Sequence, residues 1–233
     1  MYPVLSANTP SGAYNLTKSL RFRSSASAYL NRTPSSASNR TTWTWSAWVK
    51  RGTLGSAQML LSAGVSQPAT DNLTVLKFES TDTLRFGGYE SATFKELNTT
   101  QVFRDPSAWY HIVAVLDTTQ ATSSNRMKLY VNGSQITSFG TANYPTQNYQ
   151  FGVNNNQTHN IGRYYYDTVS NPSYFDGYMT EINFIDGQAL TPSSFGENNA
   201  TTGVWQPKKY TGTYGTNGFY LKFTDITLNL KYH

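Results

Sequence analysis

The chain has 233 residues, a formal net charge of +5 and a pI of about 9.3, and a single β-sandwich can fill this length. Lysine and arginine are scattered with no run longer than two, so the clustered basic surface that binds nucleic acid is not indicated. No stretch of 18 apolar residues occurs, which argues against membrane insertion, and the absence of cysteine excludes disulfides. The N-terminal segment also lacks the basic start and apolar centre of a signal peptide.

The composition favours β-structure. Aromatic residues make up 15% of the chain and include 17 Tyr, which suits pleated, half-buried strands. Only 13% of the residues are charged, about half the usual share. Asn, Ser and Thr are abundant, so we expect a surface whose hydrogen bonds are made mainly by neutral groups.

Strand patterns follow one another along the chain. The alternating run at 42–50 places Trp43 and Trp45 on one face, where we expect core packing, and Trp48 on the other. The apolar run at 109–116 indicates a strand that is covered on both faces. Asn132-Gly133 is the dipeptide that best fits a type I′ hairpin turn, because both positions need a positive φ.

One helical turn is also expected, with Thr191 as the N-cap and Pro192 at the first helical position. The strands that we expect, in chain order, are 19–22, 28–30, 42–50, 58–63, 73–79, 83–87, 93–97, 100–103, 109–116, 127–131, 134–139, 159–164, 177–186, 218–223 and 226–230.

These patterns define a fold class. Many short strands, almost no helix and no internal repeat predict an all-β fold, an antiparallel jelly-roll β-sandwich of two packed sheets. No boundary divides the sandwich into two domains. We expect an N-terminal arm at 1–17, the sandwich at 18–223 and a C-terminal strand or tail at 224–233.

Four segments, in order and with suitable spacing, resemble the concanavalin A-like lectin/glucanase superfamily in its laminin-G-like branch. They are TWTWSAWVKRG at 42–52, WYHIVAVLDTT at 109–119, MKLYVNG at 127–133 and FDGYMTEINFIDGQALTPSSFG at 175–196, with NIGR at 160–163 before the last. The amino-acid sequence is also similar to that of lectin-like domains in structural proteins of tailed phages, particularly marine ones. This resemblance implies a component on the virion surface, such as a tail fibre or a head decoration, with other virion proteins as partners. A homotrimer is one assembly that such components form.

The sequence gives no sign of an enzyme. Glucanases of the superfamily present their catalytic carboxylates on a Glu-x-Asp-x-(x)-Glu strand, and no such run occurs here. The nearest series is Asp176, Glu181 and Asp186, whose spacing of five puts successive side chains on opposite faces of a strand. No histidine cluster and no G-x-S-x-G motif accompany it.

Two loops combine aromatic rings with neutral amides, the groups that sugar recognition needs. They are 143–157 and 163–174, joined by the strand at 159–164, so we expect them side by side at one rim. In the alternatives, the tyrosines pack inward or the loops contact protein. The candidate residues for binding a carbohydrate or a partner are Tyr149, Asn154, Asn155, Asn156, Tyr164, Tyr165, Tyr166, Asp167 and Tyr174.

The resemblance further implies a structural calcium ion near the edge of the sandwich. Glu181 matches the acidic position of the closing strand motif, and Asp176 is the second carboxylate that we nominate. Calcium takes six to eight oxygen ligands. An ordinary outward-facing strand carboxylate at Glu181 is therefore the alternative.

The leading hypothesis is a non-enzymatic, lectin-like phage virion protein that attaches to host-surface glycans or decorates the particle. The first alternative is a capsid or tail cement protein that binds only other virion proteins. The second is a glycan hydrolase whose site follows no recognised motif.

Overall fold

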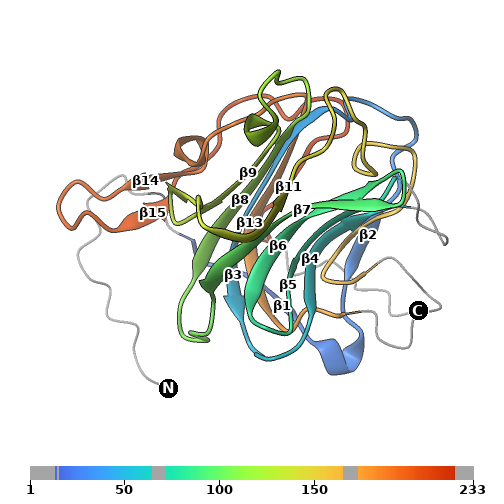
Figure 1. Ribbon diagram of the computed structural model, residues 1–233. Helices are drawn as coiled ribbons and strands as arrows, with labels where there is room; N and C mark the ends of the chain where they lie inside the picture. Colours follow the sequence, from blue (N-terminus) through green and yellow to red (C-terminus); the bar gives the residue numbers. More distant parts are fainter. Residues whose placement is uncertain (1–13, 15, 65–71, 165–172, 224–233) are drawn as a thin grey trace.

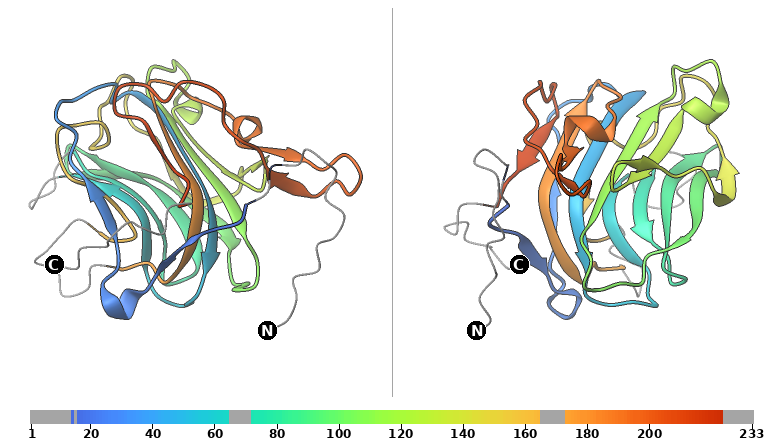
Figure 2. Two further views of the ribbon diagram at one scale, coloured as in Figure 1. Left: turned by 180° about the vertical axis from the view of Figure 1, so that it is seen from behind. Right: turned by 90° about the vertical axis from the view of Figure 1, so that its left-hand side faces the viewer.

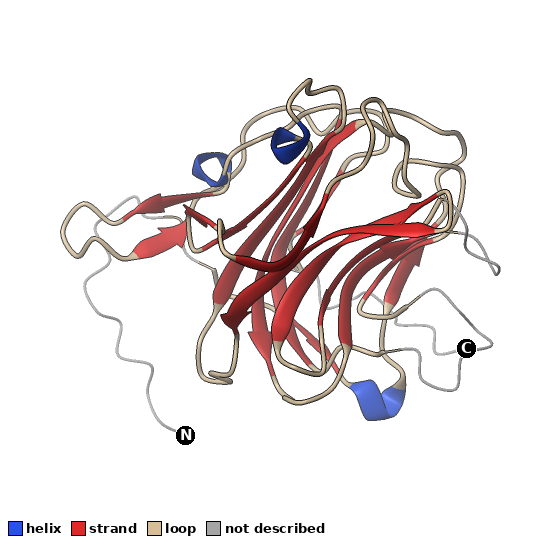
Figure 3. Cartoon of the chain, viewed as in Figure 1, coloured by secondary structure: helices blue, strands red, loops and turns tan. Residues whose placement is uncertain are grey.

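Two antiparallel sheets packed face to face form the body of the protein (Figure 1). The computed structural model describes residues 14, 16–64, 72–164 and 173–223. The helices of this part are three short 3₁₀ turns at the ends of the sandwich (Figure 3), and none is long or apolar enough to cross a membrane. The turns are η1 (Ser24–Ala26), η2 (Ser123–Asn125) and η3 (Pro192–Ser194).

The first sheet has the order β1-β13-β3-β8-β9-β10, and β16 pairs with β13 on the same side as β1. The second sheet has the order β11-β7-β6-β5-β4-β12-β2, and β14 and β15 form a separate hairpin. The strands of the first sheet are β1 (Leu20–Phe22), β3 (Thr42–Arg51), β8 (Tyr110–Asp117), β9 (Met127–Val131), β10 (Ser134–Gln135), β13 (Gly177–Asp186) and β16 (Phe219–Leu221). Those of the second are β2 (Leu30–Arg32), β4 (Gln58–Ala63), β5 (Thr74–Phe78), β6 (Thr83–Glu90), β7 (Thr93–Val102), β11 (Phe139–Asn143) and β12 (His159–Ile161). The hairpin strands are β14 (Gly196–Asn198) and β15 (Trp205–Pro207).

The alternation in β3 has the predicted consequence. Trp43 and Trp45 are fully buried between the sheets, and Trp43 meets Phe86 of the second sheet edge-to-face at 5.6 Å between ring centroids. Such aromatic pairs contribute about 0.5–1.5 kcal/mol beyond the area that they bury. Trp48 points to the other face of the first sheet. The predicted division of the three tryptophans is therefore confirmed.

Part of the outer face of the first sheet is covered. Residues 187–218 cross it, and they bury Val113, Val115 and Ile185 against Phe195 in a second hydrophobic cluster. Strand β8 is therefore buried on both faces, which explains why its sequence is apolar nearly throughout. The β14–β15 hairpin of this covering segment projects from the side of the sandwich (Figures 1 and 2).

The hairpin turn after β9 has the expected geometry. Asn132 and Gly133 have φ values of 49° and 82°, so both lie in the region that a type I′ turn requires. A Cβ atom on Gly133 would lie 2.6 Å from the Trp205 ring. This glycine therefore serves both the turn and the close approach of the β14–β15 hairpin.

Several boundaries differ from the sequence prediction. Residues 93–102 form one strand instead of two, and 134–139 is broken by an irregular segment between β10 and β11. The β14–β15 hairpin was not predicted, and the strand expected at 226–230 lies outside the described residues. Pro192 does begin a helical turn, but the Thr191 side chain makes no capping hydrogen bond and contacts the Ser193 hydroxyl instead.

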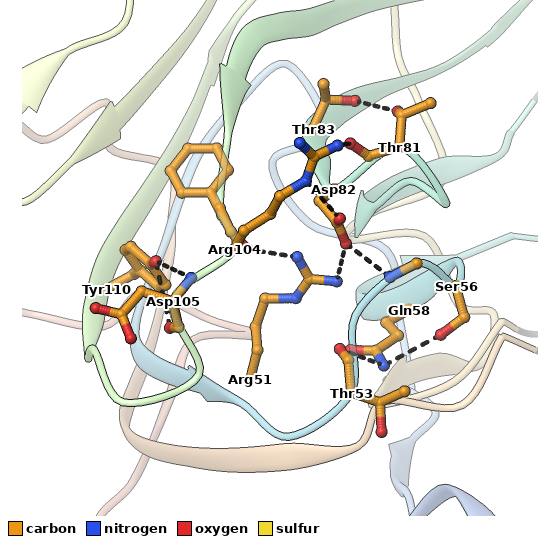
Figure 4. A network of polar contacts seen from close by, with 12 residues as sticks. Arg51, Thr53, Ser56, Gln58, Thr81, Asp82, Thr83, Arg104, Asp105 and Tyr110 are labelled. Carbon is orange, nitrogen blue, oxygen red and sulfur yellow. Dashed lines mark hydrogen bonds and ion pairs between the residues drawn. The ribbon is translucent and has the colours of Figure 1, made fainter.

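A buried ion pair joins the two sheets at one end of the sandwich (Figure 4). Arg51, at the end of β3, is 1% exposed, and its guanidinium lies 2.9 Å from Asp82 in the β5–β6 turn. A second guanidinium nitrogen donates to the carbonyl oxygen of Phe103 at 2.6 Å. The guanidinium also stacks over the Phe78 ring at 4.3 Å.

The Asp82 carboxylate is enclosed by donors. Burial alone would raise the pKa of Asp82, but the Gly55 N–H and the guanidinium groups of Arg104 and Arg51 outweigh it and hold this pKa below its usual value. Asp82 is therefore ionised at neutral pH and compensates the buried charge of Arg51. The end of β3, the turn after it and the β5–β6 turn are thus held by one carboxylate.

We predict that Arg51→Met destabilises the protein by about 3–5 kcal/mol, because it removes the buried partner of Asp82 and leaves only the largely exposed guanidinium of Arg104 to compensate this carboxylate. Urea unfolding at pH 7 measures the change. Lys77→Gln is the control, since Lys77 and Glu79 form a partly exposed pair on the second sheet, and its loss is expected to cost less than about 1 kcal/mol. Equal losses in the two variants would contradict a special role for Arg51.

Candidate functional site

Two of the residues that the sequence nominated for binding pack into the scaffold, Tyr149 half-buried and Asn154 fully buried. The Tyr149 ring packs edge-to-face on Phe151, and its hydroxyl donates to the Tyr89 carbonyl oxygen at 2.9 Å. Asn154 is fully buried, and its amide donates to Asp186 at 2.8 Å and to the Asn39 carbonyl oxygen. Both side chains stabilise the scaffold, as the inward-packing alternative allowed, and the fully buried Asn154 is not available to a ligand.

The other nominated residues are dispersed. Asn155 is half-buried, and Asn156, which is exposed, donates its N–H to the Asn155 side chain. Tyr164 packs against the cluster of Met59, Leu73 and Val75 on the outer face of the second sheet. Tyr174 lies 6.3 Å from the Tyr29 ring. The remaining three, Tyr165, Tyr166 and Asp167, lie outside the described residues.

The described parts of the two nominated loops do not meet at one rim. Asn154 is bonded to Asp186, at the last residue of β13, whereas Tyr174 lies three residues before β13 begins. Ten residues of extended strand span roughly 30 Å. The intervening strand β12 pairs with β4, and Asn154 and Tyr174 lie on either side of it, well apart.

The two carboxylates nominated for calcium do not form a common site. Asp176 pairs with Arg21 at 2.8 Å and accepts from the Thr53 hydroxyl at the same distance. Glu181 is only 6% exposed, and its carboxylate accepts the hydroxyls of Tyr14 and Tyr220 at 2.8 and 2.5 Å. No group of three or more metal-ligating side chains occurs in the described ranges, and these residues therefore do not fit the six to eight oxygens that calcium takes.

The structure instead reveals a groove of about 460 Å³ over the outer face of the first sheet, which we call the tryptophan groove. Trp48 and Thr180 contribute from β3 and β13, and Trp109, just before β8, is 36% exposed. Residues 14 and 16–19 and strand β15 complete the groove. It is lined by Tyr14, Leu16, Thr17, Lys18, Ser19, Trp48, Trp109, Thr180, Gln206 and Pro207.

A stack of three rings supports this groove. Trp48 stacks on His111 at 5.0 Å between ring centroids, and His111 stacks on Trp205 of β15 at 5.9 Å. The Trp205 indole N–H donates to His111 Nδ1 at 3.0 Å. Since Nδ1 is the acceptor, the neutral imidazole carries its proton on Nε2, which donates to the Ser46 hydroxyl at 2.9 Å.

The other wall is anchored at two points. The Thr180 hydroxyl donates to the Lys18 carbonyl oxygen at 2.8 Å, and Tyr14 is held by Glu181 and Tyr220. Burial, followed by the hydrogen bond to Glu181, raises the pKa of Tyr220, so this hydroxyl remains a donor. Glu181 itself has a φ of 52° within a bulge of β13, a strained conformation that these hydrogen bonds maintain. The groove is thus preformed on both sides.

The sequence indicated little of this groove. The predicted alternation placed Trp48 on the outer face, but it carried no information that residues 14–19 and 205–207 would border that face. A lone tryptophan before a strand, such as Trp109, is also typical of ordinary packing. The signal that was present is the pairing of an outward Trp48 with His111 opposite it on the neighbouring strand.

A family model described as the concanavalin A-like lectin/glucanases superfamily matches residues 24–194. This match spans more than half of the chain, and the protein therefore belongs to that superfamily. No match to the chain is found among curated protein sequences.

Solved structures with the same kind of fold come from diverse sources. A putative carbohydrate binding protein from Bacteroides ovatus is similar at 16% identity and a TM-score of 0.52, over 83% of this chain and 52% of that one. A heptameric SAP-like pentraxin from Limulus polyphemus has 18% identity and a TM-score of 0.47, over 70% and 71% of the two chains. Mouse laminin alpha1 domains LG4-5 have 11% identity and a TM-score of 0.47, over 87% and 46%. The chain thus spans about half the length of the Bacteroides protein, and the likeness concerns the lectin-like fold alone.

We predict that stability falls as the pH drops from about 6.5 because two histidines are buried in the neutral form. Burial lowers the pKa of His111 to about 3 and that of His159 to about 4. The unfolded chain binds their protons near pH 6.5, so each histidine reduces the free energy of unfolding by up to about 1.4 kcal/mol per pH unit below that value.

Urea unfolding between pH 7.5 and 5 measures this slope. The variant His111→Gln is expected to show a shallower dependence than the wild type, because only His159 then contributes. Identical slopes in the two proteins would contradict the neutral state of His111.

Proposed function

We propose that the protein is a non-enzymatic glycan-binding module, displayed on the surface of a tailed-phage particle, whose binding site is the tryptophan groove. The observation that carries this proposal is a preformed groove with tryptophan rings along it. The volume of about 460 Å³ lies within the range of roughly 300–1,000 Å³ that is usual for small-ligand sites.

The chemistry of the groove suits a sugar ring. The apolar face of a pyranose packs on the exposed ring of Trp109 and displaces water from it. Hydroxyls of Thr17 and Ser19 and the amide of Gln206 lie along the same groove. Asn199 donates to the Gln206 carbonyl oxygen at 3.0 Å, which fixes the orientation of this amide.

The arrangement of carboxylates supports binding without hydrolysis. Glycoside hydrolysis needs two carboxyl groups roughly 5–9.5 Å apart on either side of one bond. Asp176, Glu181 and Asp186 are separated by about 16 Å for each five residues of extended strand. Each of them also accepts hydrogen bonds from protein groups.

The virion location rests on the sequence resemblance described above. A second candidate function, cementing of capsid or tail proteins, is favoured by one observation. Val204 is 63% exposed in the loop of the projecting β14–β15 hairpin, and an exposed apolar tip on a projection suits insertion into a protein partner.

We predict that Trp109→Ala weakens binding to a glycan array by about tenfold or more, because burial of one aromatic side chain contributes roughly 1.5–3 kcal/mol. Tyr178→Ala is the matched control, since Tyr178 is 39% exposed and lies outside the groove. If both variants bind glycans equally well, the binding site lies outside the tryptophan groove. Turnover of any glycan would overturn the non-enzymatic assignment.

We predict that the protein is present in purified virions and that immunogold labels it on intact particles. A cement protein would remain bound to particles and recognise no glycan on the array. Absence from purified virions would refute the virion role while leaving glycan binding by the isolated domain open to its own test.

A further inference from the structure

A second groove of about 380 Å³ lies where the edges of the two sheets meet, away from the residues of the tryptophan groove. Strand β10 ends the first sheet and β11 ends the second (Figure 1), and residues of β9 and β11 line the same groove. The groove is lined by Ser124, Asn125, Met127, Lys128, Gln135, Ile136, Thr137, Phe139, Ala142 and Tyr144. We call it the edge groove.

Apolar side chains support the edge groove from below. Met127 is fully buried in the core, and Ile136, Phe139 and Tyr144 pack against that core. The backbone is fixed as well, since the Ile136 N–H donates to the Leu129 carbonyl oxygen at 2.9 Å. The lining is therefore held by the same contacts that hold the sandwich.

Six of the residues that line this groove have polar side chains, and none of these side chains has a hydrogen bond or ion pair within the described part of the chain. These are Ser124, Asn125, Lys128, Gln135, Thr137 and the hydroxyl of Tyr144. The neighbouring Arg126 behaves differently, because it donates to the carbonyl oxygens of Gln120, Ala121 and Pro145 at 2.8 Å each. Arg126 thus fixes the loops beside the groove, while the lining side chains keep their donors and acceptors for a ligand.

The only charge in the lining of the edge groove is positive. Lys128 is the single charged residue in the lining, and no carboxylate lines it. Lysines on the second sheet are compensated, since Lys77 pairs with Glu79 at 3.0 Å and Lys95 lies 3.9 Å from Glu90. Lys128 has no such partner among the described residues, so its ammonium favours a ligand with one negative group.

We propose that the edge groove binds a saccharide residue that carries a carboxylate, as a uronic acid does. The Lys128 ammonium pairs with the carboxylate. The amides of Asn125 and Gln135 and the hydroxyl of Thr137 form hydrogen bonds with the ring hydroxyls, and the Tyr144 ring meets the apolar face of the sugar. This proposal extends the glycan-binding function to an acidic class of sugar at a separate site, and it does not require the tryptophan groove to bind.

Titration of the ¹⁵N-labelled full chain with trigalacturonate tests the proposal by NMR. The side-chain amide signals of Asn125 and Gln135 are expected to shift. Lys128→Gln is expected to weaken binding about tenfold, whereas Lys128→Arg keeps the charge and most of the affinity. The control Lys209→Gln removes an exposed lysine outside both grooves and is expected to leave binding unchanged.

Two further arms identify the ligand chemistry and separate this site from the proposed glycan site. The trimethyl ester of trigalacturonate is expected to bind at least tenfold more weakly, and Trp109→Ala is expected to bind the acid as the wild type does. Equal affinity for acid and ester, unchanged binding by Lys128→Gln, no shift of the two amides, or tighter binding of a sulfated trisaccharide would overturn the proposal.

Discussion

The buried pair of Arg51 and Asp82 is the contact on which the packing of the two sheets depends at one end. The positive charge of Arg51, from β3, lies inside the sandwich, and a carboxylate from the opposite sheet compensates it. A sandwich held by apolar packing alone would not require such a pair. At the other end, Asp186 accepts the Asn154 amide and the Asn217 N–H at 2.8 and 2.9 Å. A buried polar network thus lies at each end of the sandwich, and these directional contacts restrict the relative position of the sheets.

This fixed scaffold carries its recognition surfaces outside the core. The covering segment 187–218 buries the outer face of β8, and Trp205 in that segment completes the ring stack with His111 and Trp48. The same packing that stabilises the segment therefore forms one border of the tryptophan groove. The edge groove arises differently, from the meeting of two sheet edges, and its polar lining contrasts with the aromatic lining of the first. One fold thus presents two surfaces of different chemistry.

Prediction from sequence succeeded where a local pattern has a single structural meaning. The two-residue period of β3 assigned Trp43 and Trp45 to the core, and Asn132-Gly133 specified a turn with two positive φ values. It did not reveal that Asn154 is buried, because an amide has the same identity whether it contacts a ligand or Asp186 inside the protein. Loop composition therefore indicated which residue types suit sugars, but it did not indicate which of them reach the surface.

The sequence by itself determined an all-β sandwich of the concanavalin A-like superfamily, since strand period, turn dipeptides and motif order are properties of neighbouring residues. The tertiary structure decided where a ligand can be held, because both grooves combine segments far apart in the chain. Tyr14, Trp48 and Gln206 meet in one groove, and Lys128 and Tyr144 meet in the other. Their proximity results from sheet order and from the path of the covering segment, which depend on long-range packing rather than on any local pattern.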